Sequence, residues 1–347
     1  MPRSKKALRL PTLEEVAAQA GVSRATVSRV VNEVGTVDPA LVAKVRAAIA
    51  QVGYSPNLAA RALMTNRTDL VALVAHEPDT RVFSDPFFAG IVRGVSQELR
   101  RAKLRMVLMM IQSPEDLDQF NAYLRAGHVD GVLLISEHGS NPISSHAEEA
   151  GLPIVMGGRP FDSSDITFVD NDNRGGAELA AARLVSLGRQ RIATIAGPLD
   201  MSAGVDRLEG FRRGVGDRFD ETLVEHGDFT LKGGADAARR LLDRHPDVDG
   251  IFVASDLMAL GVLPVLREAG LRVPEDVAVV GFDDIELATY ADPPLTTVRQ
   301  HTRDQGRLMV RTLLALLGRE LPTEDERLVD GTQSLVNPVE LVVRQSG

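Results

Sequence analysis

Three charged side chains lie where a binding site commonly forms. Asp256 and Asp283 each follow a short apolar run directly, and Arg207 lies just beyond another. If those runs are parallel β-strands, the three residues meet at the carboxyl edge of a sheet, where α/β proteins bind their ligands. Carboxylates accept hydrogen bonds from vicinal hydroxyls and an arginine donates to them, so the set predicts a cleft for a sugar-like ligand.

Each of these residues also has an ordinary structural interpretation. Asp256 could cap the helix that begins there, and Arg207 could form a surface ion pair. Phe87, Phe88 and Phe229 fall in predicted loops or helix starts. They could offer flat apolar faces to a pyranose ring, or they could be plain core residues.

The sequence lacks the motifs of the common enzyme classes. It contains no G-x-x-x-x-G-K-[ST], G-x-S-x-G or H-E-x-x-H pattern, and no G-x-G-x-x-G after a strand. Asp283 and Asp284 could be compared with a glycosidase pair, but adjacent residues at a strand end point apart. There are no cysteines, and the seven histidines are scattered without ligand spacing. We therefore expect a binding protein with no metal and no other cofactor.

The elements that must position these residues form a repeated βα pattern. Amphipathic segments of helical period separate the apolar runs, and the pattern splits near Asn171 into two similar halves. The prediction is an α/β fold with two doubly wound lobes and a cleft between them. Three late segments, at 296–298, 308–317 and 339–343, follow an apparently complete second lobe and are predicted to be crossovers. The predicted strands are 70–75, 106–111, 131–136, 153–158, 191–197, 250–255 and 277–282.

Residues 12–32 predict two short helices around a tight turn. Thr12 and Glu15 have the spacing of a capping box, Gly21 suits a left-handed helix end, and Ser23 can cap a second helix. This pattern is typical of a helix-turn-helix, whose second helix fits the DNA major groove, although a plain helical hairpin remains possible. Asp38 would cap a third helix with an apolar stripe of Leu41, Val45, Ile49 and Val52.

The charge distribution favours DNA binding by the N-terminal part. Residues 1–68 hold ten Lys and Arg against four Asp and Glu, a net +6, whereas the other 279 residues hold 29 against 44, a net −15. The basic residues 1–68 can bind DNA phosphates and displace their counterions, whereas the acidic remainder of the chain is repelled by them. The alanine-rich segment 56–65 is either a hinge helix that needs a partner or an ordinary linker. No apolar run approaches the roughly 20 residues of a membrane span, and we expect a cytoplasmic protein.

Several longer motifs occur in order along the chain. They are TLEEVAAQAGVSRATVSRVVN and GYSPNLAARAL in the first part, then DPFFA, DNRGG, IAGP, DRLEGFR, ASDLMALGVL, VPEDVAVVGFDD and PPLTTVRQ. Through these motifs the chain resembles the lactose-repressor (LacI/GalR) family over essentially its whole length. The implied fold is a three-helix headpiece with a hinge helix, followed by a two-lobed core like that of periplasmic binding proteins. The implied bounds are 1–55 for the headpiece, 56–68 for the hinge and 69–347 for the core, with an N-lobe of about 69–170 and 300–328 and a C-lobe of about 171–299 and 329–347.

The resemblance implies a set of DNA contacts. Arg24, Ala25 and Arg29 would read base edges, and Leu63, with Ala59 beside it, would wedge into the minor groove at the centre of a palindromic operator bound by a homodimer. The remaining positions implied to bind DNA are Thr12, Ser23, Thr26, Ser28, Asn32, Tyr54 and Asn57.

The resemblance also implies a small-molecule effector in the core. Ser255 stands where the family commonly has asparagine, and Met201 stands where a purine-binding member has arginine, which disfavours a purine. The G-P-L-D-M-x-x-G-x-D-R stretch resembles members that respond to oligosaccharides such as cellobiose. A repressor released by a saccharide is therefore expected; a corepressor-dependent repressor and a transport-type sugar-binding protein are the alternatives. The implied effector contacts are Arg207, Asp283, Phe87, Phe88, Phe229, Ser255, Asp256 and Gln300.

Overall fold

The computed structural model describes residues 11–32, 37–55, 67–139, 143–161, 166–319 and 334–347. The chain divides into two compact units, Met1–Thr68 and Asp69–Gly347, which are treated separately below. No helix within the described ranges is long and apolar enough to cross a membrane.

The first unit contains the predicted helix-turn-helix. Its helices are α1 (Leu13–Ala20), α2 (Arg24–Val31) and α3 (Pro39–Val52). The capping box is present, because the Thr12 hydroxyl accepts from the Glu15 amide while the Glu15 carboxylate accepts from the Thr12 amide. Gly21 ends α1 with φ of 63°, a left-handed conformation that costs glycine little. These local features set the angle between α1 and α2.

A small core joins the three helices. Val16, Val27 and Val45 are fully buried and come one from each helix. The stripe predicted for α3 was wrong at Leu41, which is 37% exposed, and Val42 packs against the core instead. The helix is rotated relative to the prediction because Val42, Val45, Ala48, Ile49 and Val52 together cover one face.

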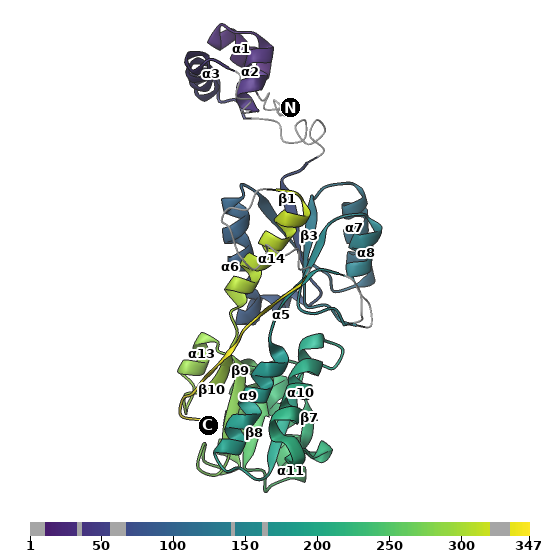
Figure 1. Ribbon diagram of the computed structural model, residues 1–347, viewed down its shortest axis with the longest axis vertical. Coiled ribbons are helices and arrows are strands. Elements are labelled where there is room, and N and C mark those ends of the chain that lie inside the picture. The colour runs from purple at the N-terminus through teal and green to yellow at the C-terminus, as the bar shows by residue number, and fades with distance from the viewer. Residues whose placement is uncertain (1–10, 33–36, 56–66, 140–142, 162–165, 320–333) are drawn as a thin grey trace, which may run out of the picture. The chain divides into compact units, whose positions relative to one another are not determined.

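The second unit contains two six-stranded sheets (Figure 1). The first has the order β11-β5-β4-β3-β1-β2 and the second β12-β10-β9-β8-β6-β7. In both sheets the direction of winding reverses beside the first strand, and all pairs are parallel except β10 with β12. The predicted α/β class with two doubly wound lobes is confirmed. The strands are β1 (Leu70–Ala75), β2 (Arg105–Met110), β3 (Gly131–Ile135), β4 (Ile154–Gly157), β5 (Phe168–Asn171), β6 (Ile192–Ala196), β7 (Val224–His226), β8 (Gly250–Val253), β9 (Ala278–Asp283), β10 (Thr296–Arg299), β11 (Ser334–Asn337) and β12 (Glu340–Val342).

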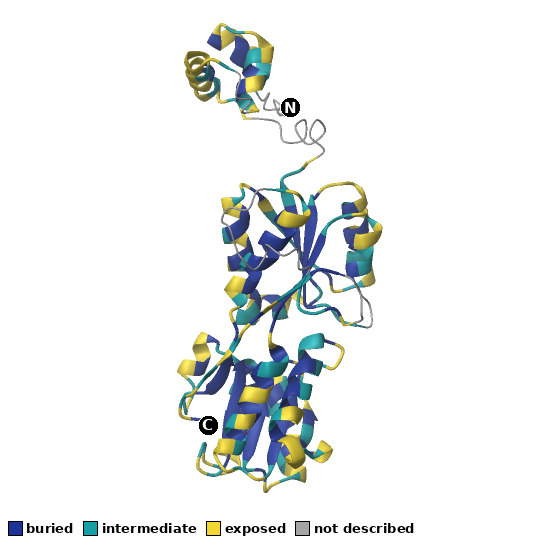
Figure 2. Ribbon diagram, in the orientation of Figure 1, coloured by how far each residue is buried: buried dark blue, intermediate teal, exposed yellow. Residues whose placement is uncertain are grey.

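Helices cover the sheets, whose central strands are mostly buried (Figure 2). The edge strands β2, β7, β11 and β12 are mostly half-buried or exposed. In the first lobe, α6 and α14 lie on one face of the sheet and α7 and α8 on the other (Figure 1). Successive residues of β1 point to opposite faces, so Leu73 packs with the α6 side and Val74 with the α7 side. In the second lobe α9 packs against α10, and α11 against α12. The helices are α5 (Asp79–Ser84), α6 (Pro86–Arg101), α7 (Pro114–Arg125), α8 (Ser144–Glu149), α9 (Asn173–Ser186), α10 (Ser202–Val215), α11 (Leu231–Arg244), α12 (Asp256–Glu268), α13 (Glu286–Thr289) and α14 (Thr302–Leu316).

The chain passes between the lobes three times in the described residues. It crosses from β5 to α9, from β10 to α14 and from β11 to β12. Two expectations are corrected here. The stretch at 296–298 is the fifth parallel strand of the second sheet, since β10 pairs with β9, and residues 334–337 belong to the N-lobe, since β11 pairs with β5. The C-lobe therefore resumes only after Asn337.

Candidate functional site

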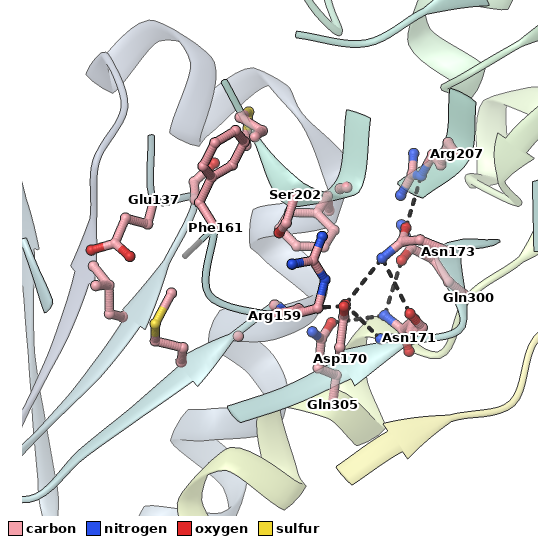
Figure 3. Close-up of a pocket in the computed structure, with 18 residues that line it drawn as sticks. Glu137, Arg159, Phe161, Asp170, Asn171, Asn173, Ser202, Arg207, Gln300 and Gln305 are labelled. Carbon is pink, nitrogen blue, oxygen red and sulfur yellow. Dashed lines mark hydrogen bonds between the residues drawn. The ribbon is translucent and has the colours of Figure 1, made fainter. Parts of the chain in front are cut away.

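Two neighbouring chambers with shared lining residues lie between the carboxyl ends of the two sheets. We call them the Phe229 chamber and the Asn171 chamber (Figure 3), because Phe229 lines only the first and Asn171 lines only the second. Because both lobes contribute lining residues, either chamber changes shape when the lobes move. The residues common to both are Phe87, Ser136, Met201, Ala203, Arg207 and Gln300.

Arg207 is the best fixed donor in the cleft. It projects from the first turns of α10 and is only 5% exposed. Its Nε donates to Asn173 Oδ1 at 2.9 Å and its Nη1 to the Ala254 carbonyl at 2.6 Å, while the guanidinium stacks over the Phe282 ring at 3.8 Å. Burial lowers the pKa of Arg207, and the nearby Asp283 carboxylate opposes that shift. The side chain is therefore held in one orientation before any ligand arrives.

Asp283 is the matching acceptor at the end of β9. It lies 3.4 Å from Arg207 Nη1, and its Oδ1 accepts from Gln300 Nε2 at 2.6 Å. Its φ of 123° is unusual for a residue with a side chain and marks a strained turn out of the strand. Burial raises the pKa of Asp283 to about 7, so near neutral pH the carboxyl can both donate and accept.

Asp256 lies close enough to Arg207 and Asp283 to interact with both, but it lines neither chamber. It is fully buried, and its carboxylate accepts from the Thr297 hydroxyl at 2.6 Å and from the Ile285 amide at 3.0 Å. The helix cap is Ser255, whose hydroxyl accepts from the Met258 amide. Asp256 thus ties α12 to β10 beneath the cleft, and burial raises its pKa well above the usual range. Ser255 itself lines the Phe229 chamber.

The three predicted phenylalanines all line the cleft. Phe87 lines both chambers, and Phe88 and Phe229 line the Phe229 chamber. Phe88 also belongs to the N-lobe core, so the two interpretations of its role coincide. Gly197 permits the position of Phe229, because a Cβ at Gly197 would lie 2.2 Å from the Phe229 ring. Aromatic faces therefore border the donors and acceptors, as in sites that bind sugar rings.

Several residues of the cleft were not predicted from the sequence. Arg81 and Asp85 enter it from the short helix α5 and the cap of α6, and burial raises the pKa of Asp85. Asp170 and Asn171 enter it from the end of β5, and burial raises the pKa of Asp170 to about 6. The signal that was available is the D-N-D-N run at 170–173, an unusual polar cluster directly after a strand.

The candidate DNA-binding face lies on α2. Arg24, Ala25 and Arg29 are exposed, while Thr26 and Ser28 are half-buried. Arg24 makes an exposed ion pair with Glu14 at 2.9 Å, a contact of little energetic weight that phosphate or a base can replace. The hydroxyl of Ser23 caps α2 through the Thr26 amide.

The remaining predicted DNA contacts lie on either side of α2. Thr12 caps α1, exposed Asn32 ends α2, and half-buried Tyr54 packs on the headpiece core, where burial raises its pKa. The predicted contacts that lie outside the described residues are Asn57, Ala59 and Leu63.

A helix-turn-helix unit followed by a two-lobed core with a polar cleft defines a ligand-binding transcription regulator. Residues 12–57 match the bacterial regulatory proteins of the lacI family, and residues 181–347 match the periplasmic binding protein-like domain. The chain is 50% identical over 344 residues to the HTH-type transcriptional regulator CelR of Thermobifida fusca, covering 98% of this chain and 99% of that protein. It is 36% identical over 311 residues to the ribose operon repressor of Escherichia coli K12, covering 88% and 92%.

The solved structures that match the chain are also transcriptional regulators. A transcriptional regulator CelR–cellobiose complex matches with a TM-score of 0.75 and 47% identity, covering 97% of this chain and 100% of that one. The lac repressor dimer bound to operator and the anti-inducer ONPF matches with a TM-score of 0.84 and 28% identity, covering 97% and 99%. The chain belongs to the lacI family of bacterial regulatory proteins. It is a DNA-binding transcriptional regulator and not an enzyme.

Proposed function

We propose that this regulator represses carbohydrate-utilisation genes and that a cellobiose-like disaccharide in the interlobe cleft releases it from DNA. It acts in the cytoplasm as a homodimer on a palindromic operator. In this proposal residues 1–55 are the DNA-binding headpiece, 56–68 the hinge, and 69–347 the effector-binding and dimerisation core.

One observation carries the effector assignment. Arg207 and Asp283 form a buried donor–acceptor pair beside Phe229 in a cleft that both lobes line. This combination suits a neutral polyhydroxylated ring, because hydroxyls can satisfy both charged groups while a ring face covers the phenylalanine. The complex of a relative with cellobiose, at 47% identity, supports a disaccharide as the first candidate.

The exposed face of α2 is the proposed DNA-reading surface. Arg24 and Arg29 are the exposed cations on that helix, and an arginine can grip a guanine with two hydrogen bonds. Thr12, Ser23, Thr26, Ser28, Asn32, Tyr54 and Asn57 hold the phosphates and fix the register. Leu63 and Ala59 bind the central minor groove when the hinge is folded.

Release follows from movement of the lobes. The effector binds the closed cleft more tightly than the open one, so binding shifts the population toward closure. Closure changes the angle between the N-lobes of the dimer and separates the paired hinges. An isolated helix of about two turns is unstable in water, so each hinge melts and the minor-groove contact is lost.

The test is a DNA-binding titration on the full-length chain. An operator is first selected from a library of random duplexes, and its affinity is then measured by fluorescence anisotropy with increasing cellobiose, lactose, maltose or glucose. The expected result is a fall in operator affinity with cellobiose of at least about tenfold, since allosteric coupling is typically 1–3 kcal/mol. An effector that instead raises operator affinity would support the corepressor alternative, and no response to any saccharide would remove the saccharide assignment.

A further inference from the structure

Glu14 is an acidic residue in the basic, DNA-binding part of the chain. Residues 1–68 contain only four Asp and Glu. Glu15 and Asp38 take part in the caps of α1 and α3, and Glu33 lies outside the described residues. Glu14 is the fourth, in the first turn of α1. A carboxylate close to DNA is repelled by the phosphates and lowers the affinity for every sequence alike.

Glu14 lies among the proposed DNA contacts. Its Oε1 is 2.9 Å from Nε of Arg24, the first residue of α2, and both side chains are exposed, at 60% and 68%. In a helix-turn-helix the N-terminal residues of the second helix contact the base edges. Burial and the nearby Glu14 carboxylate raise the pKa of Tyr54, another proposed DNA contact. The carboxylate therefore lies beside the residue that is proposed to read a base.

The contact determines which Arg24 nitrogens remain for DNA. A cation in the first turn of a helix opposes the helix dipole, so Arg24 is not placed there to stabilise α2. Glu14 occupies Nε, whereas arginine grips the O6 and N7 atoms of guanine with two parallel hydrogen bonds. Nη1 and Nη2 can form that pair while Nε stays on Glu14.

The carboxylate also changes what Arg24 prefers to bind. An arginine without a partner is drawn to any phosphate by its charge, and such contacts carry no sequence information. A neighbouring carboxylate offsets that charge but leaves the directional hydrogen bonds to guanine in place. An exposed ion pair contributes little to stability, but it becomes stronger where water is removed, as in an occupied major groove. Affinity is thus exchanged for discrimination between sequences.

We propose that Glu14 is a specificity-determining residue of the headpiece, which positions Arg24 on a guanine and disfavours its contact with phosphate. The inference rests on the proposed base contact of Arg24 and adds a second residue, from α1, to the reading of that base pair. Arg29, the other exposed arginine of α2, is the internal comparison.

The test begins by locating the base pair that Arg24 reads. An operator is selected from random duplexes with the full-length chain, and each base pair is then replaced symmetrically in both half-sites. Fluorescence anisotropy without sugar gives the affinities of wild-type protein, Arg24→Ala and Arg29→Ala. The Arg24 position is the pair whose replacement costs wild-type protein about tenfold or more but hardly affects Arg24→Ala. We expect this pair to be G·C.

Glu14→Ala should then lose discrimination at the Arg24 position alone. The cost of replacing that pair should fall below about threefold, and the cost at the Arg29 position should stay within about twofold of the wild-type value. Glu14→Gln keeps an acceptor for Arg24 Nε and should retain more discrimination than Glu14→Ala. The double variant Glu14→Ala/Arg24→Ala should discriminate no less than Arg24→Ala, because both substitutions remove the same contact.

Binding to an unrelated duplex reports the repulsive effect of the carboxylate. Glu14→Ala and Glu14→Gln should both bind it more tightly than wild-type protein. The slope of log affinity against log salt should become steeper by up to about one, as Arg24 turns to a phosphate.

A charge-matched control separates positioning from net charge. Ala47→Lys raises the charge of the headpiece by the same single unit at an exposed position of α3. It should leave discrimination at the Arg24 position unchanged. Circular dichroism and thermal unfolding report whether Glu14→Ala folds, and Glu14→Gln, which has nearly the same shape as the natural side chain, gives the repulsion and salt results if it does not.

The outcomes distinguish the role of Glu14 from that of Arg24. Loss of discrimination confined to the Arg24 position in Glu14→Ala, and absent in Ala47→Lys, supports the proposal. A uniform gain in affinity with unchanged discrimination, or an equal loss at every position, would overturn it and leave the base contact of Arg24 standing. If Arg24→Ala loses discrimination at no base pair, the proposed base contact of Arg24 is itself wrong, and the role of Glu14 falls with it.

Discussion

At the scale of single residues, the geometry of Arg207 leads to the first prediction. Arg207→Lys should weaken cellobiose binding by at least about tenfold, because an ammonium group cannot keep the planar contacts with Asn173, Ala254 and the Phe282 ring together. Operator binding without sugar should be retained, since the substitution lies in the core unit. Calorimetry and anisotropy measure the two affinities.

A matched control lies on the same helix. Arg213→Lys changes an exposed arginine that pairs with Glu209 at 3.0 Å, and it should leave sugar affinity unchanged. Equal losses in Arg207→Lys and Arg213→Lys would mean that α10, rather than the Arg207 guanidinium, determines binding.

Some residues of the cleft could be predicted from the sequence, and others could not. Arg207 and Asp283 were placed at the cleft because strand ends converge in a parallel sheet. Asp256 also follows a strand end in the sequence, but it lies beneath the cleft. Ser255 caps the helix α12, and the Asp256 carboxylate accepts a hydrogen bond from the Thr297 hydroxyl. The D-N-D-N run marks Asn171 as a polar residue directly after a strand, but its hydrogen-bond partners Gln300 and Gln305 come about 130 residues later, and no local pattern records that contact.

At the scale of elements, the long apolar runs predicted strands well and the short polar ones were missed. β5 ends in Asp170 and Asn171, and β7 has only three residues, so neither gives an alternating or continuous apolar signal. β11 was assigned to the wrong lobe because its sequence does not record which sheet edge it joins. Edge strands and crossovers are determined by tertiary packing, which local patterns do not contain.

Two loops from different lobes meet at the cleft and should make effector binding depend on pH. His138 follows β3 in the N-lobe, and Asp200 follows β6 in the C-lobe. The distance from His138 Nδ1 to Asp200 Oδ2 is 2.7 Å, and the distance from His138 Nε2 to Glu77 Oε1 is 3.4 Å. Hydrogen bonding to Glu77 and Asp200 raises the pKa of His138 against the opposing effect of burial. Burial and the nearby His138 lower the pKa of His76. Arg81 also faces Glu77. Protonated His138 can donate to both lobes at once and thereby favours closure.

The sign of this dependence follows from linkage. A raised pKa in the closed state means that the contact contributes fully below the ordinary histidine pKa of about 6.5 and is lost as pH rises through the higher, closed-state value. Cellobiose affinity of wild-type protein should therefore fall by about threefold or more between about pH 6 and pH 8.5. His138→Gln should flatten that part of the profile, leaving only the titration of groups such as Asp283. An identical slope in both proteins would show that the loop contact does not contribute.

At the scale of the whole molecule, sensing and DNA binding belong to different units. The core holds the cleft, the headpiece holds the exposed arginines of α2, and the charge is divided accordingly, with +6 on residues 1–68 against −15 on the remainder. The segment around 56–68 connects the two units covalently. A substitution there should change the output without changing the sensor.

Leu63→Ala is the substitution that tests this division. If Leu63 inserts between base pairs when the hinge is folded, shortening it should reduce operator affinity by about tenfold or more, given the few kcal/mol involved in unstacking a base step. Cellobiose affinity, measured without DNA, should remain within about twofold of the wild-type value, because both chambers are formed by the core alone. The weakened complex should also respond less to cellobiose, since the contact that the effector normally removes is already missing. Parallel losses of operator and sugar affinity would place Leu63 in the fold of the core unit and not in a separate DNA-binding hinge.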